Sequence, residues 1–272
     1  MRNHLFPPMA VIVLLFAADA IEAQHSSPDP GARAEVRLGV EAYLARNVEL
    51  ARAHYERALA IDSTEFEARW RLAEVILDIG KQTPDSVKSP ARDSLYALAE
   101  RVARIAVSVA PDSANGYYVL SAAIGRTSLT KSKKERVRRA GEIREFALRA
   151  LAIEPNHDKA THILGRWNAE IMRLSSLERF FAKNFLGGKI FNAASWDSAV
   201  VYMDRAVALS SANIYHRLSL AEILVDMKRY GEARSHLAMI PDLPLYDVMD
   251  PQYKLDAAAL RRRIEGKKDK GQ

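Results

Sequence analysis

The 272-residue sequence contains no cysteine. A disulfide framework, a thiolate metal site and a cysteine nucleophile are therefore excluded. Glycine and proline are scarce, with 12 and 11 residues, whereas alanine, leucine and arginine are abundant. This composition disfavours a sheet-rich sandwich and favours helices. Beyond the N-terminus no apolar run reaches about 18 residues, so we do not expect the body of the chain to cross a membrane.

The N-terminus has the pattern of a secretory signal peptide. A positive charge precedes ten apolar residues at 9–18, which are too few for a stable transmembrane helix but suit a signal-peptide core. We expect cleavage after Ala23, with cleavage after Ala20, an uncleaved anchor or a buried helix as alternatives. Residues 1–23 are interpreted as the signal peptide and 24–31 as a flexible leader. The mature protein is then exported, to a periplasmic or extracellular location.

A similar alanine-rich helix ending recurs four times along the rest of the chain, at 58–63, 106–111, 150–155 and 206–211. Each copy ends a segment in which apolar residues recur at i, i+3 or i+4, and i+7, the spacing of an amphipathic helix. The copies therefore indicate successive pairs of helices that pack side by side.

The uneven spacing of these copies indicates that residues are inserted between the two helices of several pairs. We locate the insertions near 81–94, 127–136 and 172–193. Lengthening a connection costs little free energy, so the stack of helices should survive them. A further pair follows without an insertion. Residues 241–272 are expected to form a capping helix, near 253–264, and a basic tail.

The repeated unit resembles the tetratricopeptide repeat. Its first copy contains Leu38-Gly39, Tyr43, Ala51, Tyr55 and Ala58, an alternation of small and aromatic residues that matches this repeat. The small residues allow the two helices to approach, and Tyr55 fills the space beside them. The resemblance implies an all-α, tetratricopeptide-like α-solenoid over residues 32–240, with about five helix pairs, an inserted helix and a C-terminal capping helix. An unrelated helical solenoid is the alternative.

The second half carries a more specific resemblance. The segment His162-Ile-Leu-Gly-Arg-Trp167 is followed by Leu174-Ser-Ser-Leu-Glu-Arg179 and Phe185-Leu-Gly-Gly188. This order is similar to that of the regulator of microtubule dynamics family, although Ser176 stands where the family usually has tryptophan. The resemblance implies a helical scaffold and marks a family signature at Gly165, Arg166, Trp167, Leu177, Glu178 and Arg179. Relatives in animal cells are tied to microtubules or organelle contacts, but an exported chain is not expected to meet tubulin.

The sequence contains no motif of a catalytic or cofactor site. It has no glycine-rich phosphate loop, no H-E-x-x-H and no G-x-S-x-G. His157 and His162 are five residues apart, which does not place them on one helix face as a metal-binding pair requires. We therefore expect a protein that is not an enzyme and needs no cofactor or metal.

We predict that a protein or peptide partner binds to the concave face of the solenoid. The first helix of each pair should line this face with a stripe of residues spaced three and seven apart. The candidate contacts are Trp70, Glu74, Tyr118, Lys159, His162, Arg166 and Glu222. The same stripe contains Val36, Val40, Tyr43, Glu67 and Leu218, and about half of all these side chains are expected to be buried between units instead. Aromatic rings beside Arg and Glu suit the binding of an extended peptide or a helix.

A basic stretch at 126–139 offers an alternative function. It contains seven positive residues and one glutamate, which suits either a solvated connection or an anionic partner such as lipid headgroups. The apolar helix 174–186 is expected to pack into the concave face, with a partner-binding lid or a membrane-surface helix as alternatives. Together the two segments would make an envelope- or membrane-associating factor with peripheral membrane contact. No nucleic-acid partner is expected, because no aromatics interleave with the basic residues.

Overall fold

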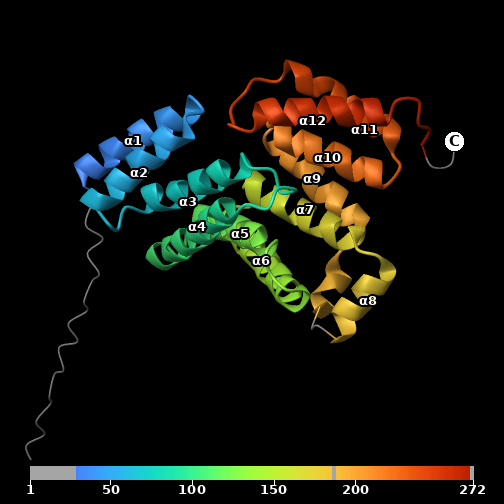
Figure 1. The fold of residues 1–272 in the computed structure, drawn as a ribbon, viewed down its shortest axis with the longest axis horizontal. Coiled ribbons are helices and arrows are strands. Elements are labelled where there is room, and N and C mark those ends of the chain that lie inside the picture. Colours follow the sequence, from blue (N-terminus) through green and yellow to red (C-terminus); the bar gives the residue numbers. More distant parts are fainter. Residues whose placement is uncertain (1–28, 186–187, 270–272) are drawn as a thin grey trace, which may run out of the picture.

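The computed structural model describes residues 29–185 and 188–269, and within them it contains helices but no β-strand. The predicted signal peptide and most of the leader lie outside the described residues. The helices form consecutive pairs that follow one another along a curved stack (Figure 1). The prediction of an all-α solenoid of stacked helix pairs is confirmed.

The first three pairs each consist of two consecutive helices. They are α1 (Pro30–Leu44) with α2 (Val48–Ile61), α3 (Phe66–Lys81) with α4 (Pro90–Val109), and α5 (Ala114–Ser128) with α6 (Lys133–Ile153). In the second and third pairs, much of the additional sequence lengthens helices: α4 has 20 residues and α6 has 21.

The fourth pair is interrupted and the fifth is not. Helices α7 (Asp158–Arg173) and α9 (Trp196–Leu209) form the fourth pair, and α8 (Ser176–Phe185) and the 3-10 helix η1 (Gly188–Ala193) lie between them in sequence. The fifth pair is α10 (Ile214–Asp226) with α11 (Tyr230–Met239), followed by η2 (Ile240–Asp242) and α12 (Asp250–Arg263). No helix in the described ranges is long and apolar enough to span a membrane.

Small side chains at the helix crossings hold each pair together. A Cβ atom added to Gly39 of α1 would lie 2.4 Å from the ring of Tyr55 on α2. In the fourth pair, a Cβ on Gly165 would lie 2.9 Å from Met203 Cε and 3.3 Å from its backbone nitrogen. Ala51 is fully buried at the first crossing. The interpretation that small residues allow the helices to approach, with Tyr55 beside them, is confirmed.

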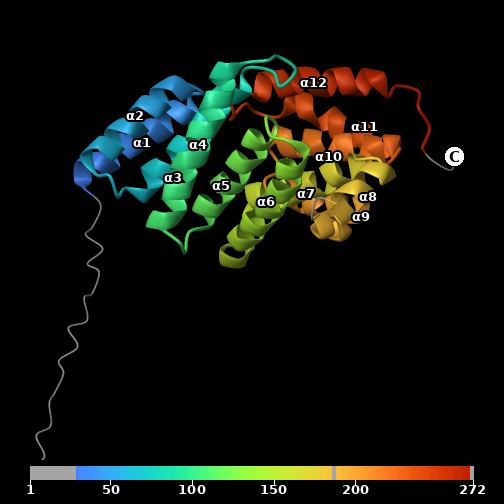
Figure 2. The same ribbon diagram turned by 60° about the horizontal axis from the view of Figure 1, so that its bottom comes forward.

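The segment before α12 connects the last pair to the first. Arg46, at the end of α1, donates a hydrogen bond from Nη1 to the Leu245 carbonyl at 3.1 Å. Val248 packs against the core of the first units, and the ring of Tyr253 stacks on Tyr215 of α10 at 4.6 Å. In Figure 1 this segment runs from the α10–α12 end of the stack toward the end of α1. Figure 2 shows α12 along the top of the stack, above α10 and α11. We call residues 243–249 the closing segment.

The inserted helix α8 does not pack into the concave face, so that prediction is wrong. Ala182 of α8 and Phe191 of η1 join a cluster with Trp167 and Ile171 of α7, against the side of α6. Leu177 and Phe180 of α8 are 65% and 56% exposed.

Candidate functional site on the inner face

The candidate site lies where α3, α5, α7 and α10, the first helices of their pairs, bring polar side chains together. We call this surface the inner face and define it by Glu74, Asp78, Lys81, Tyr118, Arg126, Lys159, His162, Arg166, Tyr215 and Glu222. Five of the predicted contacts among them come from α3, α5 and α7: Glu74, Tyr118, Lys159, His162 and Arg166.

Glu74 joins three helices through its carboxylate. It accepts hydrogen bonds from Tyr118 Oη at 2.8 Å and from Lys159 Nζ at 2.6 Å. Burial alone would raise the pKa of Glu74, but the positive charge of Lys159 and these hydrogen bonds lower it. Glu74 is therefore an ionised carboxylate whose Oε1 links α3, α5 and α7.

A second buried carboxylate, Asp78, lies one turn further along α3. It accepts hydrogen bonds from Tyr43 Oη at 2.9 Å and from Lys81 Nζ at 2.7 Å. Burial raises the pKa of Asp78 to about 6 despite the charge of Lys81, and the negative charge of Asp247 in the closing segment adds to the increase. The closing segment therefore lies close enough to the inner face to act on its electrostatics.

His162 differs from its neighbours because both of its ring nitrogens are unpaired. The residue is only 6% exposed, and neither Nδ1 nor Nε2 has a hydrogen-bond partner in the described part of the chain. Its ring lies 4.6 Å from the ring of Tyr215 and 4.7 Å from that of His216. Burial, reinforced by the charges of His216 and Arg166, holds the pKa of His162 well below its ordinary value. His162 is therefore neutral near pH 7.

Arg166 stands one turn beyond His162 on α7 and is 30% exposed in its side chain. Its guanidinium donates to Glu222 Oε2 at 2.8 Å and to Glu170 Oε1 at 2.9 Å. Burial by itself would raise the pKa of Tyr215, but the positive charges of Arg166, Arg126 and Lys81 lower it. Three cations from three helices thus act on one tyrosine hydroxyl.

Several predicted contacts belong to the core instead. Trp70 is 8% exposed and packs with the core of the first units, so we remove it from the candidate contacts. Val36 and Leu218 are buried as well. Glu67 is exposed and forms an ion pair with Arg71 on its own helix at 2.8 Å. The physical reason is that the solenoid buries each first helix on two sides. A small error in the register transferred from one unit to the next therefore assigns a buried residue to the exposed stripe.

Sequence reasoning missed Lys81, Arg126 and Tyr215. Lys81 lies seven residues after Glu74, and Arg126 eight after Tyr118, so both continue the predicted stripe by two turns. Lys81 falls in the insertion expected near 81–94 and Arg126 in the basic stretch 126–139, whereas α3 and α5 extend to Lys81 and Ser128. Extending the stripe to the end of each helix would have found both.

The first three signature residues, Gly165, Arg166 and Trp167, lie on α7 where it packs against neighbouring helices. Gly165 allows α9 to approach α7. Trp167 is buried and donates a hydrogen bond from Nε1 to the Ala140 carbonyl of α6 at 2.7 Å. Of the three, only Arg166 faces the inner face.

The remaining signature residues build the turn between α7 and α8. Glu178 accepts the Ser175 backbone N–H at 2.9 Å, and Ser175 Oγ accepts the Glu178 N–H at 3.2 Å, which is a capping box. Arg179 donates to the carbonyl oxygens of Met172 and Leu174 at the end of α7. Leu177, the other residue of the signature, points away from these contacts into solvent.

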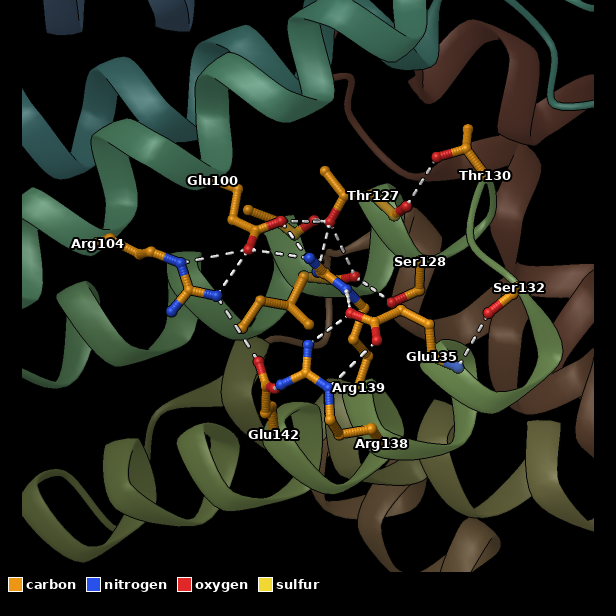
Figure 3. Close-up of polar contacts among 12 residues, drawn as sticks. Glu100, Arg104, Thr127, Ser128, Thr130, Ser132, Glu135, Arg138, Arg139 and Glu142 are labelled. Atoms are coloured by element: carbon orange, nitrogen blue, oxygen red, sulfur yellow. Dashed lines mark hydrogen bonds and ion pairs between the residues drawn. The ribbon is translucent and has the colours of Figure 1, made fainter. Parts of the chain in front are cut away.

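Much of the basic stretch 126–139 is neutralised by its neighbours. Figure 3 shows Arg139 reaching Glu100 of α4 and Thr127 of α5, with Nη1 3.0 Å from both Glu100 Oε2 and Thr127 Oγ1. Burial alone would raise the pKa of Glu100, but hydrogen bonds from Thr127, Arg139 and Arg104 lower it to about 2. Arg126 pairs with Asp85 at 3.0 Å. Arg138 is exposed but pairs with Glu135 and Glu142. The exposed cations of the stretch that form no such ion pair are Lys131, Lys133, Lys134 and Arg136.

Two surface hollows lie away from the inner face. One, of about 620 Å³, runs along α6 past Gly141 and Leu148 to Ile190 of η1. The other, of about 230 Å³, lies between Leu237 of α11 and Ala257 of α12. Neither contains a catalytic set of side chains. In the described ranges no group of three His, Asp or Glu residues could hold a metal ion.

Residues 39–265 match the family described as regulator of microtubule dynamics protein 1-3. The chain belongs to this family. No curated protein sequence matches it. Among solved structures it is similar to TTC0263, a thermophilic tetratricopeptide repeat protein of Thermus thermophilus. That likeness has 22% identity, 84% coverage of this chain, 98% coverage of the other and a TM-score of 0.61. It is also similar to PilF of Pseudomonas aeruginosa, with 16% identity, coverage of 86% and 90%, and a TM-score of 0.48.

Proposed function

We propose that this member of the family is a non-enzymatic scaffold that binds a peptide or protein segment on its inner face. The observation that carries the proposal is that the ring of Tyr215 lies against the unpaired ring of His162, and that the charges of Lys81, Arg126 and Arg166, all partly exposed, act on Tyr215 from three helices. Tetratricopeptide repeat folds typically bind proteins, and Tyr and Arg are the residue types that dominate binding energy at protein interfaces. The fold and the family support a scaffold and not an enzyme.

The inner face is suited to binding because it is rigid before the partner arrives. Glu74 ties three helices together, and Arg166 ties α7 to Glu222 of α10. A surface that is already ordered loses less conformational entropy on association, which leaves more of the contact energy for affinity.

Selection of peptides from a randomised display library against the protein beginning at Gln24 would test this function. We expect a family of selected peptides whose binding weakens at least about tenfold in Arg166→Glu. The substitution reverses the charge of this side chain and removes its hydrogen-bond donors. The matched control is Arg149→Glu, since Arg149 is 58% exposed in its side chain on α6. Equal loss of binding in both variants, or no change in either, would contradict the proposal.

We also propose that the protein is exported, with residues 1–23 as a cleavable signal. The support is the short apolar core at 9–18 followed by small residues. N-terminal sequencing of the protein recovered from the exported fraction should give Gln24 as the first residue, or Ile21 under the alternative. A chain that retains Met1 would contradict a cleaved signal.

A second candidate function is association with an anionic membrane surface. The observation that favours it is the exposure of Leu177 and Phe180 on α8 near Lys133, whose charge contributes to lowering the pKa of Glu178. Flotation with vesicles containing about 30% anionic lipid would test it, with Lys133→Glu/Lys134→Glu as the variant, since each basic residue near such a surface contributes about 1 kcal/mol. Failure of the unmodified protein to float would remove this candidate.

A further inference from the structure

We propose that the groove along α6 binds an amphipathic helix of a partner protein, one that carries acidic side chains beside its apolar stripe. We call it the outer groove and define it by Val137, Gly141, Arg144, Leu148 and Ile190. It is formed by the second helix of the third pair and by η1, so it shares no residue with the inner face. The inference is therefore independent of the function proposed above.

The floor of the outer groove has the spacing of a helix–helix contact. Val137, Gly141, Arg144 and Leu148 follow one another at intervals of four, three and four residues, which is the spacing of the seam that one helix presents to another. The seam extends over about 17 Å, or three turns of α6. Because a hollow of about 620 Å³ lies over it, this side of α6 is open to a further helix.

Gly141 lies at the middle of this seam, and the fold itself does not require a glycine there. A Cβ atom added to Gly141 would meet no neighbouring atom within 4 Å, and glycine is a poorer helix former than alanine. At helix crossings elsewhere in the chain, Gly39 and Gly165 allow a second helix to approach closely. Gly141 offers the same close approach to a helix that comes from outside the chain.

The wall of the outer groove is apolar and held in place. A Cβ atom on Gly188 of η1 would lie 2.8 Å from the Ala182 carbonyl oxygen and 3.1 Å from Val137 Cγ1, so η1 packs tightly against α8 and α6. Ile190 of η1 forms the wall, and Val137, Leu148 and Ile190 are each only partly buried. A preformed groove of this kind is the surface that the apolar face of an amphipathic helix covers.

The charges of the outer groove select an acidic helix. Three arginines and one glutamate line it: Arg138, Arg144, Arg149 and Glu145. Arg138 and Arg149 form ion pairs along α6, whereas Arg144 has no ion pair within the described ranges. Its guanidinium lies over the ring of Trp167, 5.6 Å from the centroid. A cation–π contact uses the face of the guanidinium and leaves its N–H edge for an acceptor, which a carboxylate on a partner helix supplies.

The surroundings of the outer groove have the same sign. Lys134 continues the seam by one turn toward the start of α6, and it is exposed without an ion pair in the part of the chain that the structure describes. A second copy of this chain would bring the same positive charges, and like charges that face one another oppose association. The occupant is therefore a different protein, with a helix of opposite charge.

A display library of helical peptides tests this inference. Each peptide has about 18 residues, enough to span the groove, with Ala and Leu at heptad positions a and d and with Glu, Gln or Lys encoded equally at the flanking positions. The bait is the protein beginning at Gln24, and the retained peptides are sequenced. We expect Glu to be enriched over Lys at the flanking positions. Enrichment of Lys, or no selection between Glu and Lys, would overturn the proposal.

Variants then locate the binding in the outer groove. Gly141→Leu fills the middle of the seam and Arg144→Gln removes the unpaired cation, so each should weaken the best selected peptide at least about tenfold in fluorescence anisotropy. The matched control is Arg101→Gln, because Arg101 is an exposed arginine of α4 that has no ion pair in the described ranges either, and its loss should leave the affinity unchanged. Unchanged affinity in both groove variants, or an equal loss in the control, would overturn the proposal.

Two further measurements keep the result interpretable. Circular dichroism melting checks the fold of each variant, and Gly141→Leu should fold because the space around its Cβ is open. Sedimentation velocity of the protein alone tests the other occupant, and we expect no dimer that depends on the outer groove. A dimer that Gly141→Leu abolishes would place a second copy of the chain there and overturn the acidic helix.

Discussion

Adding one methyl group at Gly39 should destabilise the fold, although alanine is the better helix former. The Cβ of alanine at this position would lie 2.4, 2.7 and 2.9 Å from three ring carbons of Tyr55, which is only 1% exposed and has no room to rotate away. Overpacking of this kind costs about 1–3 kcal/mol, and a contact at 2.4 Å belongs in the upper half of that range. The gain in helix propensity offsets about 1 kcal/mol. The expected net loss is about 1–2 kcal/mol, or a melting temperature lower by about 2–8 °C.

The matched control is Gly141→Ala on α6, where an added Cβ meets no atom within 4 Å. Only the propensity gain remains there, so this variant should melt about 2–4 °C higher than the unmodified protein. Thermal melting followed by circular dichroism measures both. If Gly39→Ala were as stable as Gly141→Ala, the helix crossing at Tyr55 would not be as close as the structure has it, and the packing argument for the repeat would fail.

Three other perturbations test separate contacts. The ionised Glu100 stabilises the fold above the ordinary glutamate pKa and loses this effect as the pH falls from about 5 to 2. In urea titrations Glu100→Gln should therefore be about 1–3 kcal/mol less stable than the unmodified protein at pH 7, and the gap should narrow toward pH 2. Trp167→Phe removes the hydrogen bond to the Ala140 carbonyl and should cost about 1 kcal/mol, and an unchanged melting temperature would contradict that role. Arg46→Ala removes the hydrogen bond to Leu245, so amide exchange in the closing segment should accelerate about three- to tenfold, and unchanged exchange would show that the bond does not hold this segment.

The pairing of helices was predictable because it depends on local signals. Gly39, Ala51 and Tyr55 are examples of small and aromatic residues that are spaced with the helical period. A small residue such as alanine at a crossing allows the two helices to approach closely in every unit. The fifth pair was predicted to have no insertion, and in the structure Lys228, with φ of 60°, lies in the short turn between α10 and α11. Such features require only the sequence near each residue.

The inner face was only partly predictable because it depends on where distant helices meet. Trp70 and Tyr118 occupy similar positions in the transferred stripe, yet Trp70 is in the core and Tyr118 bonds to Glu74. The contacts of each residue depend on which side chains the neighbouring helices present, and no single unit encodes these. The closing segment contacts α1 across 199 residues of sequence, and nothing near Leu245 in the chain indicates that contact.

The positions of the signature residues show which property the family match establishes for this chain. Gly165 and Trp167 set the distance between helices, and Glu178 and Arg179 shape one turn. These roles preserve the scaffold whatever it binds, so a match over residues 39–265 establishes the fold without establishing the ligand. Arg166 alone belongs both to the signature and to the inner face. A ligand contact therefore has to be argued from the residues around Arg166 that the signature omits, and among these both ring nitrogens of His162 have no hydrogen-bond partner in the described part of the chain.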